Sequence, residues 1–184
     1  MLLGATVFNQ PIGNCNISNV TNMEFMLFNN KNGKFNHPIN TKEVTIGNKT
    51  YTAWDTFNVQ KMRGMLHEAS VFNQPIGNWN VSNVEKMDYM FNGASEFLQN
   101  IRGWDVSKVG SSSFGDMFKG STKFLDYYGI TGTPDPAFFT QFSQTSNNGD
   151  LKAAVDEYYP DDATAPVQSA IEKYGYLNTW NVSK

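Results

Sequence analysis

The stretch FNQPIGNWNVSNVEKMDYMFNGAS, residues 72–95, decides the fold of this chain, because the chain repeats it. The next residues, 97–122, carry a second copy, FLQNIRGWDVSKVGSSSFGDMFKGST. The step along the chain from Phe72 to Phe97 equals the step from Trp79 to Trp104. A fixed period of this kind is typical of proteins in which short units stack on one another.

Two further units lie upstream of this pair. FNQPIGNCNISNVTNMEFMLF, residues 8–28, matches the unit at Phe72 almost residue for residue, with Cys15 in the tryptophan position. Another unit begins at Phe35 and is interrupted by an insertion at about residues 42–53, in which two β-prone runs flank Gly47-Asn48. This pattern predicts a β-hairpin. A fifth phenylalanine, Phe124, follows Phe97 after a slightly longer step, and the extra length falls within 110–113.

Within one unit the apolar residues change their spacing. The residues with strand spacing are Ile76, Trp79 and Val81, and those with the spacing of a helical turn are Val84, Met87, Met90 and Phe91. We therefore expect an α/β fold, a leucine-rich-repeat-like right-handed solenoid with a short strand and a helical turn in each coil of about 25 residues. The inserted β-hairpin and a C-terminal helical segment complete the expected fold.

The segments IGNWNVSNVEKMDYMFNGASEF and IRGWDVSKV resemble the BspA-like leucine-rich repeats of the DUF285 type. The resemblance covers about residues 1–124 and the last few residues. It implies an extracellular or surface protein used for adhesion or binding, and it implies no catalysis. Cys15, the inserted hairpin and the widened corner at residues 110–114 depart from the pattern.

Three segments are expected along the chain. Residues 1–124 are the repeat solenoid, and residues 125–176, where the period fails, carry two amphipathic helical patterns that predict a helical linker or hairpin. Residues 177–184, LNTWNVSK, restart the repeat. Because both ends fall inside a coil, we expect a segment of a longer protein, or a protomer completed by its neighbours.

Composition excludes several functional classes. The net charge is −3 without a basic patch, which argues against a nucleic-acid partner. There is no apolar run long enough for a membrane span, and the single cysteine allows no intrachain disulfide. The two histidines, His37 and His67, have no catalytic or metal-ligating companions at a recognisable spacing. We therefore expect no enzyme, no cofactor and no metal site.

The candidate binding residues lie on the outward side of the predicted strands. They are Asn16, Asp55, Asn78, Asn80, Ser82, Asp105 and Ser107. Stacking would place Asn16, Asp55, Asn80 and Asp105 in one column. The column is either a strip that binds a glycan, a protein or a cation, or a polar ladder whose side chains hydrogen-bond along the stack.

The large apolar residues of the repeat are expected to be structural. The set comprises Trp54, Trp79, Trp104, Met87, Met90, Phe72 and Phe97. The tryptophans would otherwise be platforms for sugar rings, but their register with the methionines favours the core. Of the Asn-x-Ser/Thr sequences, the one at Asn48 on the predicted hairpin tip is the best acceptor for glycosylation.

The functional expectation is a non-catalytic structural or adhesive protein of the cell surface, the extracellular space or a virion surface. It would present an extended face and assemble with copies of itself or with neighbouring repeat arrays. The alternative is a receptor-like module that binds a glycan or a protein.

Overall fold

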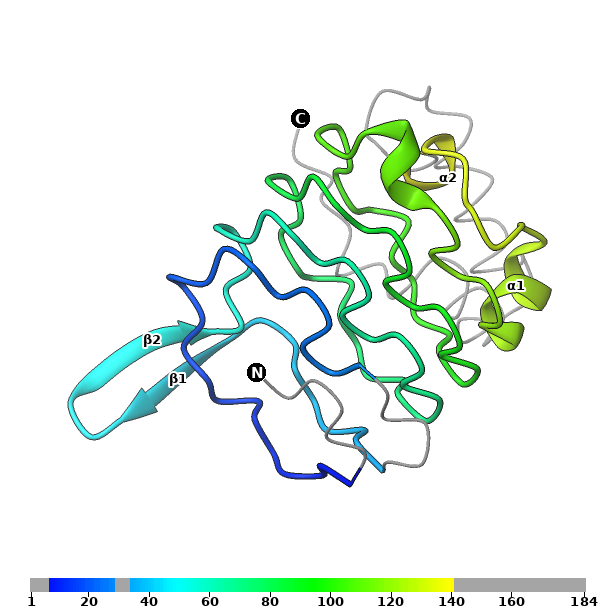
Figure 1. The fold of residues 1–184 in the computed structure, drawn as a ribbon. Helices are drawn as coiled ribbons and strands as arrows, with labels where there is room; N and C mark the ends of the chain where they lie inside the picture. Colours follow the sequence, from blue (N-terminus) through cyan, green and yellow to red (C-terminus); the bar gives the residue numbers. More distant parts are fainter. Residues whose placement is uncertain (1–6, 29–33, 141–184) are drawn as a thin grey trace, which may run out of the picture. The chain divides into compact units, whose positions relative to one another are not determined.

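The computed structural model describes residues 7–28 and 34–140, and the chain winds there through successive coils that lie side by side (Figure 1). We number the coils by residues: coil 1 is 8–28, coil 2 is 35–69, coil 3 is 72–94 and coil 4 is 97–121. These residues belong to the first of two units, residues 1–140. The second unit, residues 141–184, lies outside the described residues. It contains most of the predicted helical linker and the restarted repeat.

Regular secondary structure is sparse in the described part of the chain. The strands are β1 (Lys42–Ile46) and β2 (Lys49–Ala53), and the helices are the 3-10 helix η1 (Ser111–Phe114), α1 (Thr122–Tyr128) and α2 (Ala137–Thr140). β1 and β2 pair in antiparallel register from Lys42 with Ala53 to Ile46 with Lys49. They form a hairpin within coil 2 that projects from the coils (Figure 1). Gly47, with φ of 60°, supplies the left-handed turn.

Two columns of aromatic rings run through the coils. The rings of Trp54 and Trp79 have centroids 5.8 Å apart and planes 3° apart. The phenylalanine column contains Phe8, Phe35, Phe72, Phe97 and Phe124, with successive centroids 5.5–6.5 Å apart. These distances are typical of offset aromatic stacking. Residues at equal positions of the repeat therefore pack directly on one another.

A backbone ladder joins neighbouring coils along the Met-x-x-Met segment. Alternate N–H groups of one coil donate to carbonyls of the next over 2.8–3.0 Å. From coil 2 to coil 3 the pairs are Met62 to Lys86, Gly64 to Asp88 and Leu66 to Met90, and equivalent pairs join coil 1 to coil 2 and coil 3 to coil 4. Each coil is thus held by its neighbours through backbone hydrogen bonds that do not depend on side chains.

The Met-x-x-Met segment forms tight turns where the spacing predicts a helical turn. The Met90 N–H donates to the Met87 carbonyl over 3.1 Å, and Tyr89 between them has φ of 59°. A left-handed third residue is the geometry of a type II turn. The equivalent residues of the other coils are also left-handed, namely Phe25, Gly64 and Asp116. The helix does not form because the N–H groups that it would need already donate to the neighbouring coil.

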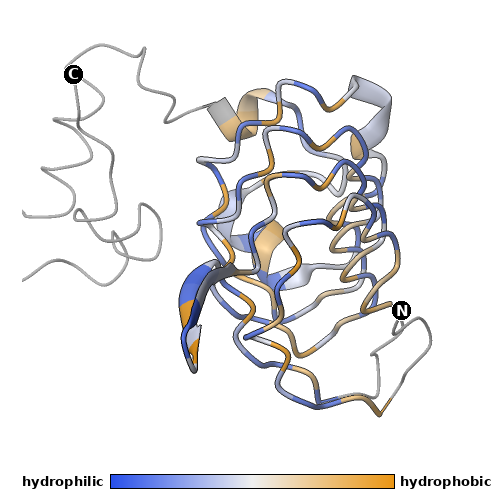
Figure 2. Cartoon of the chain, turned by 90° about the vertical axis from the view of Figure 1, so that its left-hand side faces the viewer, coloured by the Kyte–Doolittle hydropathy of each residue, from blue (hydrophilic) through white to orange (hydrophobic). Residues whose placement is uncertain are grey.

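The residues with strand spacing also form turns. The Trp79 N–H donates to the Ile76 carbonyl and the Val84 N–H to the Val81 carbonyl, over 3.1 and 2.9 Å. Parallel bridges occur further along the coil instead, between Asn22 and Lys61 and between Lys61 and Lys86. Apolar and polar residues alternate around each coil (Figure 2), so one set of side chains is enclosed and the other faces outward.

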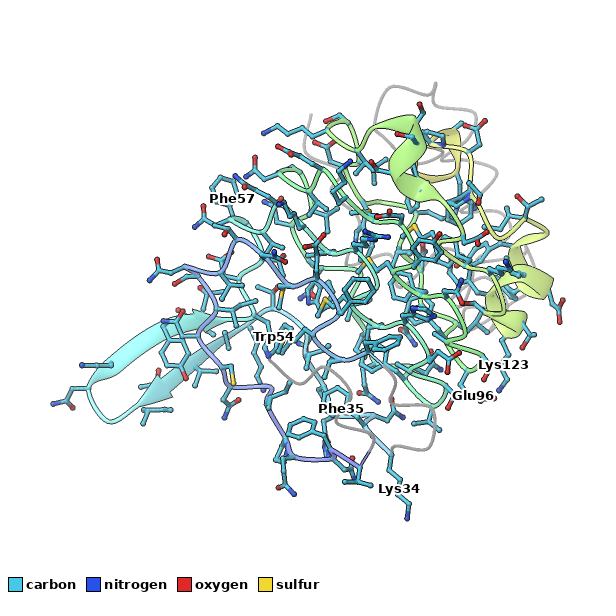
Figure 3. The ribbon with its side chains drawn as sticks, viewed as in Figure 1. Lys34, Phe35, Trp54, Phe57, Glu96 and Lys123 are labelled. Atoms are coloured by element: carbon cyan, nitrogen blue, oxygen red, sulfur yellow. The ribbon has the colours of Figure 1, made fainter. Side chains whose placement is uncertain are left out.

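The last described residues pack against coil 4. Phe139 stacks on Phe114 and Phe138 meets Phe118 edge to face. The Phe118 N–H donates to the Gly132 carbonyl over 2.7 Å. Lys123 of α1 pairs with Glu96 over 2.6 Å (Figure 3). None of the helices in the described part of the chain is both long and apolar enough to cross a membrane.

Candidate functional site

The predicted column of amides and carboxylates lies on the outside of the coils, and its side chains bond within their own coil. The Oδ1 of Asn80 accepts the Ser82 N–H over 3.1 Å and the Ser82 hydroxyl over 2.7 Å. The same bond to the N–H two residues on is made by Asn16, Asp55 and Asp105. These are Asx turns, which shape the corner that follows each buried Trp and, in coil 1, the exposed Cys15. The Oδ1 atoms therefore do not form a ladder along the stack.

Asn78 has a different role from the rest of the candidate residues. Its Nδ2 donates to the Thr41 carbonyl over 2.8 Å, and its Oδ1 accepts the Thr41 N–H over 3.3 Å. Thr41 immediately precedes β1, so Asn78 of coil 3 holds the base of the hairpin that coil 2 carries.

Amide ladders do run along the stack, but they are formed by residues outside the predicted binding set. The Oδ1 of Asn36 accepts the Asn73 N–H over 2.8 Å, and the Oδ1 of Asn73 accepts the Leu98 N–H over 2.9 Å. Gln74 and Gln99 add bonds of 3.0 and 2.7 Å to the same two oxygens. The recurring Phe-Asn of coils 1 to 3 is the sequence signal that could have identified this ladder.

A second amide ladder ends on the backbone carbonyls of the position that is Ser18 in coil 1 and Phe57 in coil 2. The Nδ2 of Asn58 donates to the Ser18 carbonyl, and that of Asn83 donates to the Phe57 carbonyl, each over 2.7 Å. Both asparagines lie three residues after the Asx-turn residue of their own coil. These hydrogen bonds join the outer corner of one coil to the outer corner of the coil before it.

One exposed aromatic side chain interrupts the polar surface. Phe57 is 50% exposed and occupies the position that Ser18, Ser82 and Ser107 hold in the other coils. Figure 3 shows Phe57 at the margin of the coils and Trp54 among them. We call this surface the Asx face; its residues are Asn16, Ser18, Asp55, Phe57, Asn80, Ser82, Asp105 and Ser107.

The charge on the Asx face is stabilised by its own turns. The hydrogen bond from the Ser107 N–H lowers the pKa of Asp105, and the Ser107 side chain and the charge of Lys108 lower it further. Asp105 is therefore ionised at neutral pH, and the face carries a fixed negative charge beside a cation.

The predicted core residues are buried. Phe72, Phe97, Met87, Met90 and Trp54 are fully enclosed, and Trp79 and Trp104 are each 3% exposed. Both ring faces of Trp79 are covered by the neighbouring tryptophans, so no sugar ring can stack on it. The Nε1 atoms of Trp54 and Trp79 donate to the carbonyls of Ile12 and Ile39, each over 2.8 Å. These rings anchor one coil to the coil before it.

A surface hollow of about 410 Å³ lies at the corner where coil 4 is longer than coil 3. Its lining residues are Glu85, Lys86, Lys108, Gly110, Ser112 and Ser113. Its polar groups are one carboxylate, two ammonium groups, serine hydroxyls and backbone, and methylene groups of the long side chains lie among them. None of these residues is in the predicted binding set.

The remaining candidates lie apart from one another. Asn48 is exposed at the hairpin tip, and Cys15 is an exposed free thiol in coil 1. His37 lies near the Asn9 carbonyl, with 3.0 Å between its Nε2 and the oxygen. Among residues 7–28 and 34–140, no three His, Cys, Asp or Glu side chains gather in a geometry that could hold a metal ion.

This geometry defines a class of protein in which backbone hydrogen bonds and stacked aromatic rings join each repeated coil to the next. A family model described as "Mycoplasma protein of unknown function, DUF285" matches residues 1–49 and 40–131, more than two thirds of the 184 residues. The chain belongs to this family, and the DUF285-type resemblance of its repeats is confirmed. No curated protein and no solved structure matches the chain.

Proposed function

We propose that the coils form a leucine-rich-repeat-like right-handed solenoid and that the chain is a non-catalytic surface protein. It presents the Asx face to copies of itself or to protein partners, in a structural or adhesive role. The observation that carries this proposal is the half-exposed ring of Phe57 in a column otherwise made of serines.

The Asx face is suited to binding because its side chains are ordered before any partner arrives. The Asx turns fix Asp55 in the coil of Phe57 and Asn80 in the next coil, and Asn58 and Asn83 hold the same corners. A preordered surface loses little conformational entropy on association. Aromatic residues, phenylalanine among them, are enriched at protein interfaces, which have a polar rim.

The hydrogen bonds of the Asx turns suit a surface that binds a partner better than one that catalyses a reaction. The carboxylates of Asp55 and Asp105 each accept a backbone N–H of their own turn. A general acid or base needs an environment that brings its pKa toward the working pH, whereas the turn moves that of Asp105 away from it. We propose no cofactor and no reaction for this face.

The proposed location is outside the cell, on a cell surface or on a virion surface. Membership of DUF285 is compatible with a surface repeat protein. In a eukaryotic secretory route, Asn48 would be the acceptor for an N-linked glycan, because it is exposed at the tip of the projecting hairpin.

Sedimentation velocity over a range of protein concentrations tests the proposal. We expect the wild-type protein to self-associate reversibly and Phe57→Ser to weaken that association, because the substitution restores the residue of the other coils. Ile46→Ser is the matched control, since Ile46 is 62% exposed but lies on the hairpin. A wild-type protein that stays monomeric at every concentration, or an equal effect of both substitutions, would contradict self-assembly through this face.

A second candidate function is a receptor-like module that binds a glycan. The polar hollow at the corner of coil 4 favours it, because lysine ammonium groups and serine hydroxyls line this hollow.

A further inference from the structure

The widened corner of coil 4 carries a surface hollow. The step from Phe97 to Phe124 is longer than the step before it, from Phe72 to Phe97, and the extra length lies at Gly110–Ser113. There the chain forms η1 and leaves a hollow of about 410 Å³ between coils 3 and 4. The hollow is shallow and open to solvent, so a ligand would lie on its surface and keep much of its own surface in water.

Positive charge gathers at this hollow in a protein whose net charge is −3. Lys86 of coil 3 and Lys108 of coil 4 both line it, together with the carboxylate of Glu85, and the carboxylate of Asp105 lies near Lys108. The backbone of Lys86 also pairs with that of Lys61 of coil 2 in a parallel bridge. Two ammonium groups at one hollow favour an anionic ligand.

The two ammonium groups at the hollow are held in place by neighbouring polar atoms. Lys86 Nζ donates to Ser113 Oγ over 3.2 Å, and Lys108 Nζ donates to Asn83 Oδ1 over 2.6 Å. An ammonium group has three N–H donors, so each lysine keeps two for a ligand. Ser113 is buried, which gives Lys86 a fixed anchor at the floor of the hollow.

The lining also indicates what kind of molecule carries the anion. It contains no aromatic or aliphatic side chain, and Ser112 and the backbone of Gly110 offer hydroxyl and peptide groups. Apolar ligands would gain little here, whereas the hydroxyl groups of a sugar find donors and acceptors. The space beside Gly110 is open, with Ser113 Oγ as the nearest atom to a side chain added there, at 3.7 Å.

We propose that the hollow formed by Lys86, Lys108, Ser112 and Ser113 binds the carboxylate or sulfate group of an acidic saccharide. The inference rests on the second candidate function, the glycan-binding module, and specifies its site and its ligand class. It is independent of self-association through Phe57, which lies on the Asx face and not among the lining residues.

Titration calorimetry of the full chain tests the site with four probes: a sulfated disaccharide, a uronic-acid disaccharide, a neutral disaccharide and inorganic sulfate. We expect at least one acidic disaccharide to bind more tightly than inorganic sulfate, and the neutral one not to bind. Lys86→Gln and Lys108→Gln should each weaken binding about tenfold, since each removes a charged hydrogen bond. Affinity should fall as salt is raised.

Lys49→Gln is the control, because it removes the same charge from an exposed position on β2. Thermal unfolding followed by circular dichroism establishes that each variant is folded. Equal loss from Lys49→Gln, or binding that survives the Lys86→Gln/Lys108→Gln double variant, would overturn this site while leaving a glycan-binding module possible elsewhere on the chain. Absence of binding to every saccharide, or inorganic sulfate binding as tightly as the disaccharides, would overturn the saccharide proposal, and sedimentation would still report on self-assembly.

Discussion

The indole rings of Trp79 and Trp104 lie one above the other, with centroids 6.3 Å apart and planes 8° apart, although they belong to different copies of the repeat. The two rings are equally buried, but their nitrogen atoms differ. Trp79 Nε1 donates to the Ile39 carbonyl, whereas Trp104 Nε1 is buried with no hydrogen-bond partner among the described residues. The pair therefore separates what ring packing contributes to stability from what the indole hydrogen bond contributes.

Substituting each of these tryptophans by phenylalanine should give unequal losses of stability. Trp79→Phe leaves the Ile39 carbonyl without its indole donor, whereas Trp104→Phe removes an N–H that is already unpaired. We expect the free energy of unfolding to fall by about 0.5–1.5 kcal/mol more for Trp79→Phe than for Trp104→Phe. Urea unfolding followed by circular dichroism measures the difference. Equal losses would show that the indole hydrogen bond of Trp79 adds nothing to ring packing.

Alanine at two glycines tests whether left-handed backbone sets the turns. Gly93 has φ of 74°, and a side chain there would meet Glu68 of the coil before at 3.5 Å. Gly103 has nothing within 4 Å. Left-handed geometry costs an L-residue about 1–2 kcal/mol. Gly93→Ala should therefore destabilise the fold by about 1 kcal/mol, and Gly103→Ala should be neutral or stabilise it by up to about 1 kcal/mol through the unfolded state.

Thermal and urea unfolding of the two alanine variants provide the measurement. The comparison is matched because both substitutions add one methyl group. A destabilised Gly103→Ala together with a neutral Gly93→Ala would contradict the assignment of the turns.

The substitutions Asn73→Ala and Asn80→Ala compare a hydrogen bond between coils with a hydrogen bond inside one coil. Asn73 Oδ1 accepts hydrogen bonds from Leu98 and Gln99 of the next coil, whereas Asn80 Oδ1 accepts from Ser82 of its own coil. We expect Asn73→Ala to cost about 1–3 kcal/mol, because it leaves the Leu98 N–H unpaired, and Asn80→Ala to cost about 0.5–1.5 kcal/mol. Urea unfolding midpoints and slopes of the two variants check the order. A larger loss at Asn80 would mean that the turn within a coil contributes more to stability than the amide bond between coils.

The repeat could be predicted from the sequence because its buried residues are large and regularly spaced. Trp79 and Trp104 occupy equal places in two copies of one motif, and this regular spacing leaves them in register when coils stack. The DUF285-type resemblance follows from the same residues and is confirmed. The hairpin position follows from Gly47, which allows the left-handed turn between β1 and β2.

The course of the chain within one coil could not be predicted by the same means. Apolar spacing at Val84, Met87 and Met90 suits a helical turn and a series of type II turns equally well. The choice is made by hydrogen bonds to the next coil, and no local pattern reports them. The left-handed residues Phe25 and Tyr89 are poor sequence signals, since bulky side chains rarely adopt this conformation.

The candidate site could be predicted only in part, because its hydrogen bonds and the fold of its loop also depend on neighbouring coils. The outward position of Asn80 and Asp105 follows from their place beside buried residues, but the sequence does not say whether their oxygens bond along the stack or within the turn. The hollow at Lys86 and Lys108 depends on how the extra residues of coil 4 are folded into η1. Such insertions change the surface without changing the repeat.

A final prediction concerns the response of the fold to acid. Burial lowers the pKa of His67, and the nearby charge of Glu68 opposes this only in part. The ring lies between Phe28, at 4.9 Å, and Tyr89, at 6.2 Å, and its Nδ1 is buried with no hydrogen-bond partner in the part of the chain that the structure describes. The folded state therefore favours the neutral imidazole.

In the unfolded chain the His67 imidazole takes up a proton near the ordinary pKa of about 6.5, whereas in the folded chain it does so only at lower pH. The stability due to neutral His67 is therefore complete above about pH 6.5. It is lost progressively as the pH falls below about 6.5 toward the folded pKa. His67→Asn, which introduces the residue that coil 3 has at Asn92, should reduce the difference in unfolding free energy between pH 7.5 and pH 5. Urea unfolding of both proteins at the two pH values measures this, and NMR titration of the His67 ring protons measures the folded pKa directly. An imidazole that titrates at or above its ordinary value in the folded protein would show that burial against Phe28 and Tyr89 does not disfavour its charge.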